Sequence, residues 1–352
     1  MVGWPDRRFL DLVGTEHPII QAPMAGAGGV DLCVAAIDGG ALGSLPCGML
    51  SPEQVRQQVA EVRARTSGTF ALNFFCHSMP AQTNDSAWRT LLQPYYEEYS
   101  VEPGNGDALR LPFGSEMCRI IEELSPPVVI FHFGLPEQAL LNRVKASGAA
   151  VIGNATNIEE ARWLEERGVD AIIAQGFEAG GHTGRFLDSD PAEALGLFAL
   201  IPLITDAVSV PVIAAGGIGD GRGIAAAMIL GASAAQLGTA YLHTPEARIG
   251  NVHRERLREG GTVLTNLLTG GLARGLRGRL INDLGPVREE APPYPLAGAA
   301  LAPIRAAAEK KGEYGFGPLW AGQAAPLGKA IAAAELTRKL AADALAILAG
   351  PE

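Results

Sequence analysis

The chain is poor in charged residues and in aromatic residues. Charged residues make up 19% of its 352 residues and apolar residues 47%, a balance that excludes an intrinsically disordered protein. Aromatic residues make up only 6%. The formal net charge is −10 and no long run of basic residues offsets it, so we expect no nucleic-acid partner.

Cysteine is also scarce. The four cysteines, Cys33, Cys47, Cys76 and Cys118, are far apart and form no Cys-x-x-Cys pair. This spacing predicts neither a metal site nor a disulfide framework, and it is typical of reduced thiols in a cytoplasmic protein. Residues 1–8 lack the apolar run of a secretory signal, which agrees with a cytoplasmic location.

One uncharged stretch, from Gly223 to Pro245, has about the length of a membrane-spanning helix. Gly231 and Gly238 interrupt it, and alanine dominates its composition. A buried helix followed by a buried strand accounts for this pattern better than a membrane span does. We therefore expect no association with a membrane.

Glycine and proline, by contrast, are abundant, with 44 and 24 residues, and short apolar runs recur between them. The runs are nearly continuous rather than alternating, which is typical of parallel strands buried on both faces. They cover residues 18–24, 40–45, 70–75, 128–133, 149–154, 170–175, 211–215 and 234–238. Segments with helical patterns separate them.

About eight strand–helix units in one chain favour an α/β fold of the (β/α)8 TIM-barrel type. The alternative is a doubly wound parallel sheet with a second domain. Gly26, Gly28 and Gly29 miss the Gly-x-Gly-x-x-Gly spacing of dinucleotide-binding sheets, and the sequence has no P-loop motif. We therefore predict a TIM barrel.

Three helix starts can be read from capping residues. Ser51 with Gln54 fits a capping box, and Thr156 with Glu159 repeats the spacing. Asp220 can cap the helix that follows the seventh predicted strand.

Two segments exceed the roughly 250 residues that a minimal barrel needs. Residues 77–125 follow the third predicted strand, and a tail runs from 248 to 352. We expect the first to be an insertion over the barrel mouth and the tail to form a C-terminal capping subdomain with a closing helix. The chain then divides into a (β/α)8 barrel, residues 1–247, and a cap, residues 248–352.

The segment after the sixth predicted strand carries the first candidate for chemistry. It reads Gln175-Gly-Phe-Glu-Ala-Gly-Gly-His182, and active sites of this fold lie at the carboxyl ends of strands. Gly180 and Gly181 let the backbone approach a ligand closely. His182 follows them on a glycine-rich loop, and a histidine there is suited to proton transfer near neutral pH.

The seventh and eighth predicted strands end in loops that are typical of phosphate sites in this fold. The backbone N–H groups of Gly216, Gly217, Gly238 and Thr239 can form a cradle for an anion. Because no lysine is close in the sequence, backbone dipoles supply most of the attraction.

The first and third strands add a flat wall and neutral amides. Ala22, Pro23 and Met24 offer an apolar surface, while Asn73 and Gln175 can each donate and accept hydrogen bonds. A large planar heterocycle with a phosphate tail fits these parts. Taken alone, Asn73 and Gln175 fit satisfied polar groups of the core equally well.

The chain resembles the nitronate monooxygenase family from about residue 18 to residue 323. The shared elements are Pro18-Ile-Ile-Gln-Ala-Pro-Met-Ala-Gly26, Gln175-Gly-Phe-Glu-Ala-Gly-Gly-His182, Ala215-Gly-Gly-Ile218, Gln236-Leu-Gly-Thr239, Thr269-Gly-Gly-Leu-Ala-Arg-Gly275 and Leu319-Trp-Ala-Gly-Gln323. One departure is that the family's usual Gly-Gly after the first Met-Ala-Gly is Ala27-Gly28-Gly29 here.

The resemblance implies FMN as the cofactor and His182 as the catalytic base. Together with the cradle, it gives a cofactor set of Ala22, Pro23, Met24, Asn73, Gln175, Gly180, Gly181, Gly216, Gly217, Gln236, Leu237, Gly238 and Thr239. Tail residues similar to the family's site cover are Tyr294, Trp320 and Gln323, which become the candidate substrate residues.

The activity implied by the resemblance is oxidation of alkyl nitronates or nitroalkanes by O2 to a carbonyl compound and nitrite. His182 removes the α-proton of a nitroalkane or holds a nitronate already formed. The alternatives are an FMN-dependent NADH:quinone reductase or enoyl-thioester reductase, a phosphate-binding lyase or isomerase without redox chemistry, and an FMN carrier without activity. The sequence carries no signal for an oligomeric state.

Overall fold

The computed structural model describes residues 3–80, 84–104, 111–188 and 190–350. Its main sheet has eight parallel strands in the order β1-β9-β8-β6-β5-β4-β3-β2. They are β1 (Ile19–Gln21), β2 (Gly43–Pro46), β3 (Phe70–Phe75), β4 (Val128–His132), β5 (Ala150–Ala155), β6 (Ala171–Gln175), β8 (Val212–Ala215) and β9 (Ala234–Leu237). Each of the eight predicted runs overlaps one of these strands.

The two ends of the sheet meet at Leu42, just before β2. The N–H of Leu42 donates to the carbonyl oxygen of Ile19 at 2.9 Å, and the N–H of Gln21 donates to that of Leu42 at 3.0 Å. These bonds bring β1 beside β2 and close the sheet as in a TIM barrel. The predicted fold class is confirmed.

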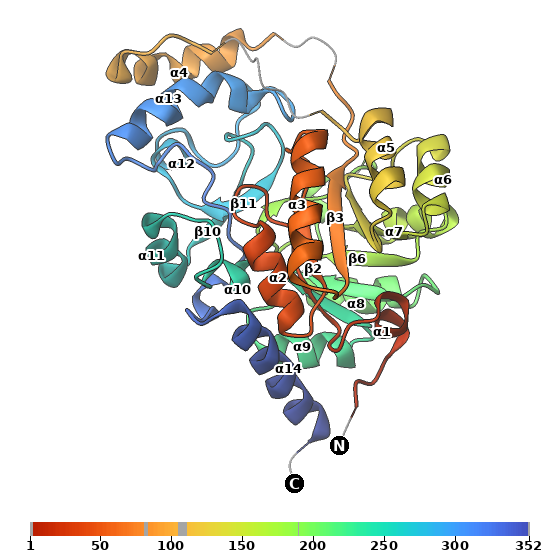
Figure 1. The fold of residues 1–352 in the computed structure, drawn as a ribbon. Helices are drawn as coiled ribbons and strands as arrows, with labels where there is room; N and C mark the ends of the chain where they lie inside the picture. The colour runs from red at the N-terminus through yellow and green to blue at the C-terminus, as the bar shows by residue number, and fades with distance from the viewer. Residues whose placement is uncertain (1–2, 81–83, 105–110, 189, 351–352) are drawn as a thin grey trace.

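Helices alternate with the strands and cover the outside of the barrel (Figure 1). They are α2 (Val30–Asp38), α3 (Pro52–Arg65), α5 (Ser115–Leu124), α6 (Gln138–Ala146), α7 (Ile158–Glu166), α8 (Leu197–Thr205), α9 (Gly221–Ile229) and α14 (Ala333–Ala349). The sequence suggests that α14 closes the cap, but the helix lies against α2 and α9 instead. The last helix therefore completes the outer layer of the barrel, more than 90 residues after β9.

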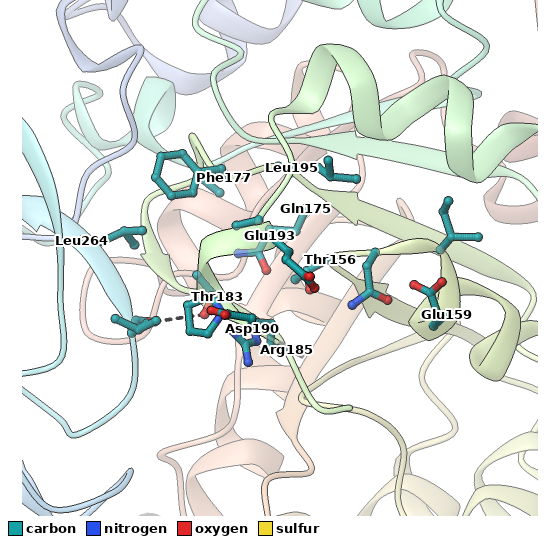
Figure 2. Close-up of a pocket in the computed structure, with 17 residues that line it drawn as sticks. Thr156, Glu159, Gln175, Phe177, Thr183, Arg185, Asp190, Glu193, Leu195 and Leu264 are labelled. Atoms are coloured by element: carbon teal, nitrogen blue, oxygen red, sulfur yellow. Dashed lines mark hydrogen bonds between the residues drawn. The ribbon is translucent and has the colours of Figure 1, made fainter. Parts of the chain in front are cut away.

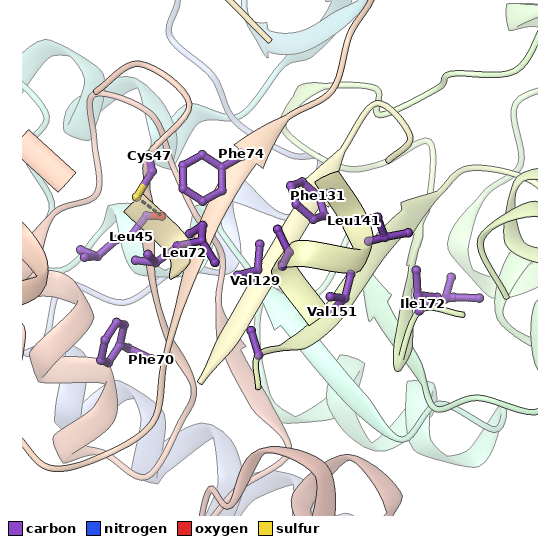
Figure 3. Packing of buried hydrophobic residues seen from close by; sticks show 14 of the residues in the cluster. Leu45, Cys47, Phe70, Leu72, Phe74, Val129, Phe131, Leu141, Val151 and Ile172 are labelled. Carbon is purple, nitrogen blue, oxygen red and sulfur yellow. Dashed lines mark hydrogen bonds between the residues drawn. The ribbon is translucent and has the colours of Figure 1, made fainter. Parts of the chain in front are cut away.

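The two faces of the strands explain why their sequences are continuously apolar. Leu72, Val129 and Val151 lie side by side across β3, β4 and β5 and pack toward the outer helices (Figure 3). The alternate residues fill the barrel interior. The short helix α1 (Arg8–Val13) adds Phe9 and Val13 to that interior cluster.

Two of the three predicted caps are confirmed. The Ser51 hydroxyl accepts from the N–H of Gln54, whose side chain accepts from the N–H of Ser51. Asp220 accepts from the backbone of Arg222 at the start of α9. The prediction at Thr156 is wrong, because its N–H and hydroxyl both bind the carboxylate of Glu160. The neighbouring Asn157 caps α7 in its place.

The insertion and the tail pack together over one end of the barrel. The helix α4 (Ser86–Tyr99) lies beside α12 (Arg279–Leu284) and α13 (Ala297–Lys310) in Figure 1. The indole N–H of Trp88 donates to the carbonyl oxygen of Ala297 at 3.2 Å, and the hydroxyl of Tyr96 donates to that of Ala300 at 2.7 Å. Residues 81–83 and 105–110 of the insertion lie outside the described residues.

The rest of the tail and the connecting turns are short elements. They are β7 (Gly181–His182), η1 (Pro191–Glu193), α10 (Thr239–Leu242), α11 (Asn251–Glu259), β10 (Thr262–Thr265), β11 (Ala273–Leu276) and η2 (Ala325–Leu327). The stretch 223–245 forms most of α9, then β9 and α10, so the predicted helix and strand are confirmed. Among the described residues, none of the helices has the length and apolar content needed to cross a membrane.

Candidate active site at the barrel mouth

The residues predicted to hold the cofactor lie at the carboxyl ends of five barrel strands. Asn73 is in β3, and Gln175 ends β6 and is followed by the segment that carries Gly180 and Gly181. The other predicted residues follow or end β1, β8 and β9. Because the strands are parallel, these ends meet at one mouth. A Cβ atom on Gly238 would lie 3.5 Å from the Cβ of Ala22 and 3.6 Å from the Sδ of Met24, so the β1 and β9 loops touch.

The loops after β8 and β9 present free backbone donors. Among the described residues, the N–H groups of Gly216, Gly217, Gly238 and Thr239 donate to no other group. Gly216 has a φ of 115° and Gly217 a φ of 65°, conformations that favour glycine. The arrangement fits a bound anion such as a phosphate.

Gln236 offers an acceptor in the same mouth. Its side chain is buried, and its Oε1 accepts from no described residue. A buried acceptor without a partner costs about 1–3 kcal/mol, so the site is suited to a ligand that brings an N–H or O–H donor. The neighbouring Leu237 differs, because its side chain packs into the hydrophobic core and only its backbone faces the β1 loop.

Asn73 is held by His132, a residue that the sequence analysis missed. The Nδ2 of Asn73 lies 2.8 Å from the Nδ1 of His132 and 3.1 Å from the carbonyl oxygen of Ile130. Since Nδ2 only donates, the His132 Nδ1 accepts and the ring proton sits on Nε2. Burial lowers the pKa of His132 to about 4, which keeps the ring neutral. The Oδ1 of Asn73 is thereby left as an acceptor.

His182 lies in a strand rather than on the predicted glycine-rich loop. The strand β7 pairs antiparallel with β11, with His182 opposite Ala273 and Gly181 opposite Arg274, and β10 completes a three-stranded sheet. Pairing with the tail supplies the backbone hydrogen bonds that a loop would lack, such as Thr183 N–H to the carbonyl oxygen of Leu272 at 2.9 Å.

Gln175 fixes the other side of this segment. Its Nε2 donates to the carbonyl oxygen of His182 at 2.9 Å. Its Oε1 accepts from the N–H of Gly184 at 2.7 Å and from the Nδ2 of Asn154 at 3.1 Å. Gln175 thus connects the end of β6 to the residues on both sides of His182.

The imidazole of His182 sits among aromatic rings from three other segments. Its ring centroid lies 5.1 Å from Tyr294, 5.4 Å from Trp320 and 6.2 Å from Phe133. His77 lies 4.9 Å from Tyr294, and Phe133 stacks on Tyr294 at 5.5 Å. We call the rings of Tyr294, Trp320, Phe133 and His77 the aromatic wall. Two of them, Tyr294 and Trp320, were predicted.

The hydroxyl of Tyr294 is buried, and it has no hydrogen-bond partner among the described residues. It therefore offers a donor beside the imidazole. Gln323 was predicted to face a substrate, but the structure places its side chain elsewhere. Its side chain is exposed, and its backbone N–H donates to the carbonyl oxygen of Glu178 at 3.0 Å.

Residues 320–323 join the loops at the mouth. Besides the bond from Gln323, the N–H of Gly322 donates to the hydroxyl of Thr239 at 2.9 Å. A Cβ atom on Gly180 would lie 2.5 Å from the Gly322 nitrogen, which explains the glycine at position 180. The tail segment thus links the β6 and β9 loops while it places Trp320 beside His182.

The sequence analysis missed several residues of the candidate site, and among them Phe133 has the most unusual backbone conformation. Its φ is 65°, an uncommon value for a bulky residue and one that clusters at functional sites. His132 and Phe133 end the fourth predicted run, so their position at a strand end could have marked them. His77 follows the end of β3 by two residues, so the same position could have marked it. Thr269, whose Oγ1 lies 2.8 Å from the Nε2 of His182, could not be found in this way, because the two residues are 87 positions apart in the sequence.

A cavity of about 190 Å³ lies next to the segment that carries His182 and is lined in part by Thr183 (Figure 2). Gln175, Phe177, Thr183, Leu195, Leu264 and Leu272 are among its lining residues. Figure 2 shows the hydroxyl of Thr183 bonded toward the tail, to the carbonyl oxygen of Leu272 at 3.3 Å. Its lining residues include neither His182 nor any residue of the aromatic wall.

Comparison with known proteins shows similarity to one family over nearly the whole chain. A family model described as nitronate monooxygenase matches residues 7–343. A nitronate monooxygenase of Paraburkholderia phytofirmans is 41% identical over 345 residues, which cover 95% of this chain and 94% of the relative. The solved structure of nitroalkane oxidase from Streptomyces ansochromogenes is 36% identical with a TM-score of 0.89 and covers 96% of this chain and 97% of its own. FabK from Thermotoga maritima is 26% identical with a TM-score of 0.73 and covers 99% and 98%.

Proposed function

Because the chain belongs to the nitronate monooxygenase family and is thus an oxidoreductase, we propose that it oxidises alkyl nitronates and nitroalkanes with FMN and O2. The products are a carbonyl compound and nitrite. The observation that carries this proposal is the imidazole of His182, whose ring lies 5.1 Å from that of Tyr294, a residue whose buried hydroxyl has no hydrogen-bond partner among the described residues.

The strand ends fit FMN in three respects. The four free N–H groups after β8 and β9 suit its phosphate. The buried Oε1 of Gln236 and the Oδ1 of Asn73 suit N–H or O–H donors of the cofactor. Ala22, Pro23 and Met24 border the same loops and offer the apolar surface that a planar ring needs.

The aromatic wall fits a small substrate with an apolar chain and a nitro group. We assign His182 the role of base, which takes the α-proton of a neutral nitroalkane and leaves the electron pair on the substrate as a nitronate. The hydroxyl of Tyr294 donates to a nitro oxygen, since it has no partner among the described residues. When bound, FMN supplies the electron acceptor for the nitronate.

Local donors must hold an anionic nitronate, because the protein carries a net charge of −10. The Tyr294 hydroxyl and a protonated His182 beside the aromatic wall are two such donors. These donors act at short range, whereas salt largely screens the repulsion from distant charges on the protein surface.

We also propose a cytoplasmic location. The four cysteines are free thiols in the structure. Burial alone raises the pKa of Cys33 to about 12, so this thiol is poorly reactive. Free cysteines are typical of a reducing compartment.

The experiment is a visible absorption spectrum of the purified protein, followed by anaerobic titration with ethyl nitronate and, separately, with NADH. We expect a flavin spectrum that bleaches with ethyl nitronate and changes slowly with NADH. Rapid bleaching by NADH without a response to nitronate indicates a reductase. A colourless protein that cannot be reconstituted with FMN contradicts the proposal and favours a barrel without redox chemistry.

A further inference from the structure

The cavity of about 190 Å³ in Figure 2 lies against the small sheet that carries His182. Successive side chains of a strand alternate between the two faces of its sheet. Thr183, which follows His182 in the chain, lines the cavity. Leu272 lines it too, and it precedes Ala273, the partner of His182 across the two strands. Both lining residues therefore point to the face of the sheet opposite to that of His182.

The walls of the cavity are largely apolar. They include Phe177 from the loop after β6, Leu195 before α8, Leu264 of β10 and Leu272 before β11. Phe177 is 37% exposed, and the three leucines are half-buried. Such side chains are usually buried in a folded protein, so a hollow that leaves four of them partly exposed favours an apolar ligand.

Three of the polar side chains that line the cavity are engaged within the protein. The hydroxyl of Thr156 donates to the carboxylate of Glu160 at 2.8 Å, and that of Thr183 donates to the carbonyl oxygen of Leu272 at 3.3 Å. Gln175 uses both its amide nitrogen and its amide oxygen in bonds to neighbouring segments. Because these groups already have partners, they do not require a ligand that brings polar groups of its own.

The charges around the cavity disfavour an anion. Three exposed carboxylates line it, those of Glu159, Asp190 and Glu193, against one guanidinium among the described lining residues, that of Arg185. In Figure 2, Glu159 lies at the opposite end of the cavity from Phe177. Exposed carboxylates remain hydrated, and an ion pair with one of them contributes little. The cavity is thus suited to an uncharged ligand.

We propose that this cavity binds a small uncharged molecule with one apolar ring, at a site distinct from the one proposed for the reaction. An apolar cavity of about 150 Å³ holds benzene, so a cavity of about 190 Å³ accommodates a single ring with a small substituent. The ligand lies next to the strand of the proposed base, because Thr183 is among the lining residues.

The test is titration of the purified protein with fluorobenzene, followed by ¹⁹F NMR. We expect a Kd of about 0.1–1 mM, the range for a ligand of this size in an apolar pocket. Ala194→Trp places an indole at an exposed lining position and should weaken binding at least about tenfold. The matched control is Ala192→Trp, which changes an exposed residue of the same segment that does not line the cavity, and it should bind like the parent.

Both variants should unfold at the urea concentration of the parent, so that a loss of binding reports on the cavity. Absence of binding to the parent, or an equal Kd in Ala194→Trp and the parent, overturns the inference. Displacement of fluorobenzene by FMN or by ethyl nitronate also overturns it, because the probe then occupies the proposed reaction site. Binding is measured without turnover, so a protein that binds fluorobenzene as expected but oxidises no nitronate contradicts only the proposed function.

Discussion

The strand ends on one side of the barrel mouth carry glycines, neutral amides and an apolar turn. On the other side, the aromatic wall combines two tail residues, Tyr294 and Trp320, with Phe133 and His77, which follow β4 and β3. The strand-end side uses residues that are close in sequence to their own strand, such as Gly216 after β8 and Gln236 in β9. The aromatic wall combines segments as distant as Phe133 and Trp320. The comparison suggests a division of labour, in which the strand ends hold the cofactor, and the tail together with Phe133 and His77 shapes the substrate site.

The largest effect that separates the two sides is expected from Gly270→Ala. The φ of Gly270 is 92°, and a Cβ atom there would lie 2.6 Å from the carbonyl carbon of Pro293 and closer still to the oxygen of Pro292. Backbone strain and overpacking together should lower the free energy of unfolding by about 2–5 kcal/mol, as measured by urea denaturation. FMN should remain bound, because the strand ends are unchanged.

The control for this substitution is Gly261→Ala. Gly261 has a similar φ of 75°, but a Cβ atom there would meet nothing within 4 Å. It should cost only the backbone strain of about 1–2 kcal/mol. If the two variants are equally stable, contact between Gly270 and the segment 292–294 does not hold the aromatic wall in place.

A smaller effect, confined to the strand-end side, is expected from Gln236→Leu. Removal of the buried acceptor should weaken FMN binding about 10–100-fold, since a hydrogen bond of this kind contributes about 1–3 kcal/mol. The same change should leave the unfolding free energy of the FMN-free protein equal or higher, because an unpaired polar atom is lost. Fluorescence titration with FMN and urea denaturation measure the two quantities.

Gln57→Leu on the exposed face of α3 serves as the control and should change neither quantity appreciably. Unchanged FMN affinity in Gln236→Leu means that the cofactor does not donate to Gln236. The division between the two sides then loses its clearest strand-end contact.

The smallest predicted effect is a pH dependence of the free energy of unfolding, to which one histidine on each side contributes. Burial lowers the pKa of both His132 and His253 to about 4. His132 ends β4, and the Nε2 of His253 bonds to the carbonyl oxygen of Trp320. Unfolding restores a pKa near 6.5, so the unfolded chain binds more protons below that pH. Above pH 6.5, neither histidine changes the free energy of unfolding. Between pH 6.5 and 4, each one lowers it by up to about 1.4 kcal/mol per pH unit.

Urea denaturation of the parent, His132→Gln and His253→Gln at pH 7.5 and 5.5 checks this sign. Each variant should lose about 1 kcal/mol less than the parent on acidification. If the two sides unfold separately, His253→Gln alters only one of two transitions. Equal acid sensitivity in all three proteins rules out a buried neutral form for both histidines.

The sequence allowed much of the barrel to be predicted because buried parallel strands leave a local signal. Each predicted run overlaps a strand, and the capping residues Ser51 and Asp220 act as expected. Thr156 failed because Glu160, one turn into the helix, binds it more favourably than a cap would. The competing contact could not be inferred from spacing alone.

The rest of the site depends on pairings across long sequence distances. The strand β7 exists only because β11 supplies its partner, about 90 residues later, so His182 reads as a loop residue in the sequence. Thr269 carries no local sign of its contact with His182 for the same reason. The helix α14 joins the barrel wall because its apolar face fits α2 and α9, although the sequence suggests part of the cap.

The central claim is that His182 is the base at the boundary between the two sides, and His182→Asn tests it most directly. The variant should keep bound FMN and oxidise ethyl nitronate at close to the parent rate. Its kcat/KM on neutral nitroethane should fall about 10²–10⁴-fold, the contribution of a general base. A variant that oxidises neutral nitroethane at the parent rate contradicts the account.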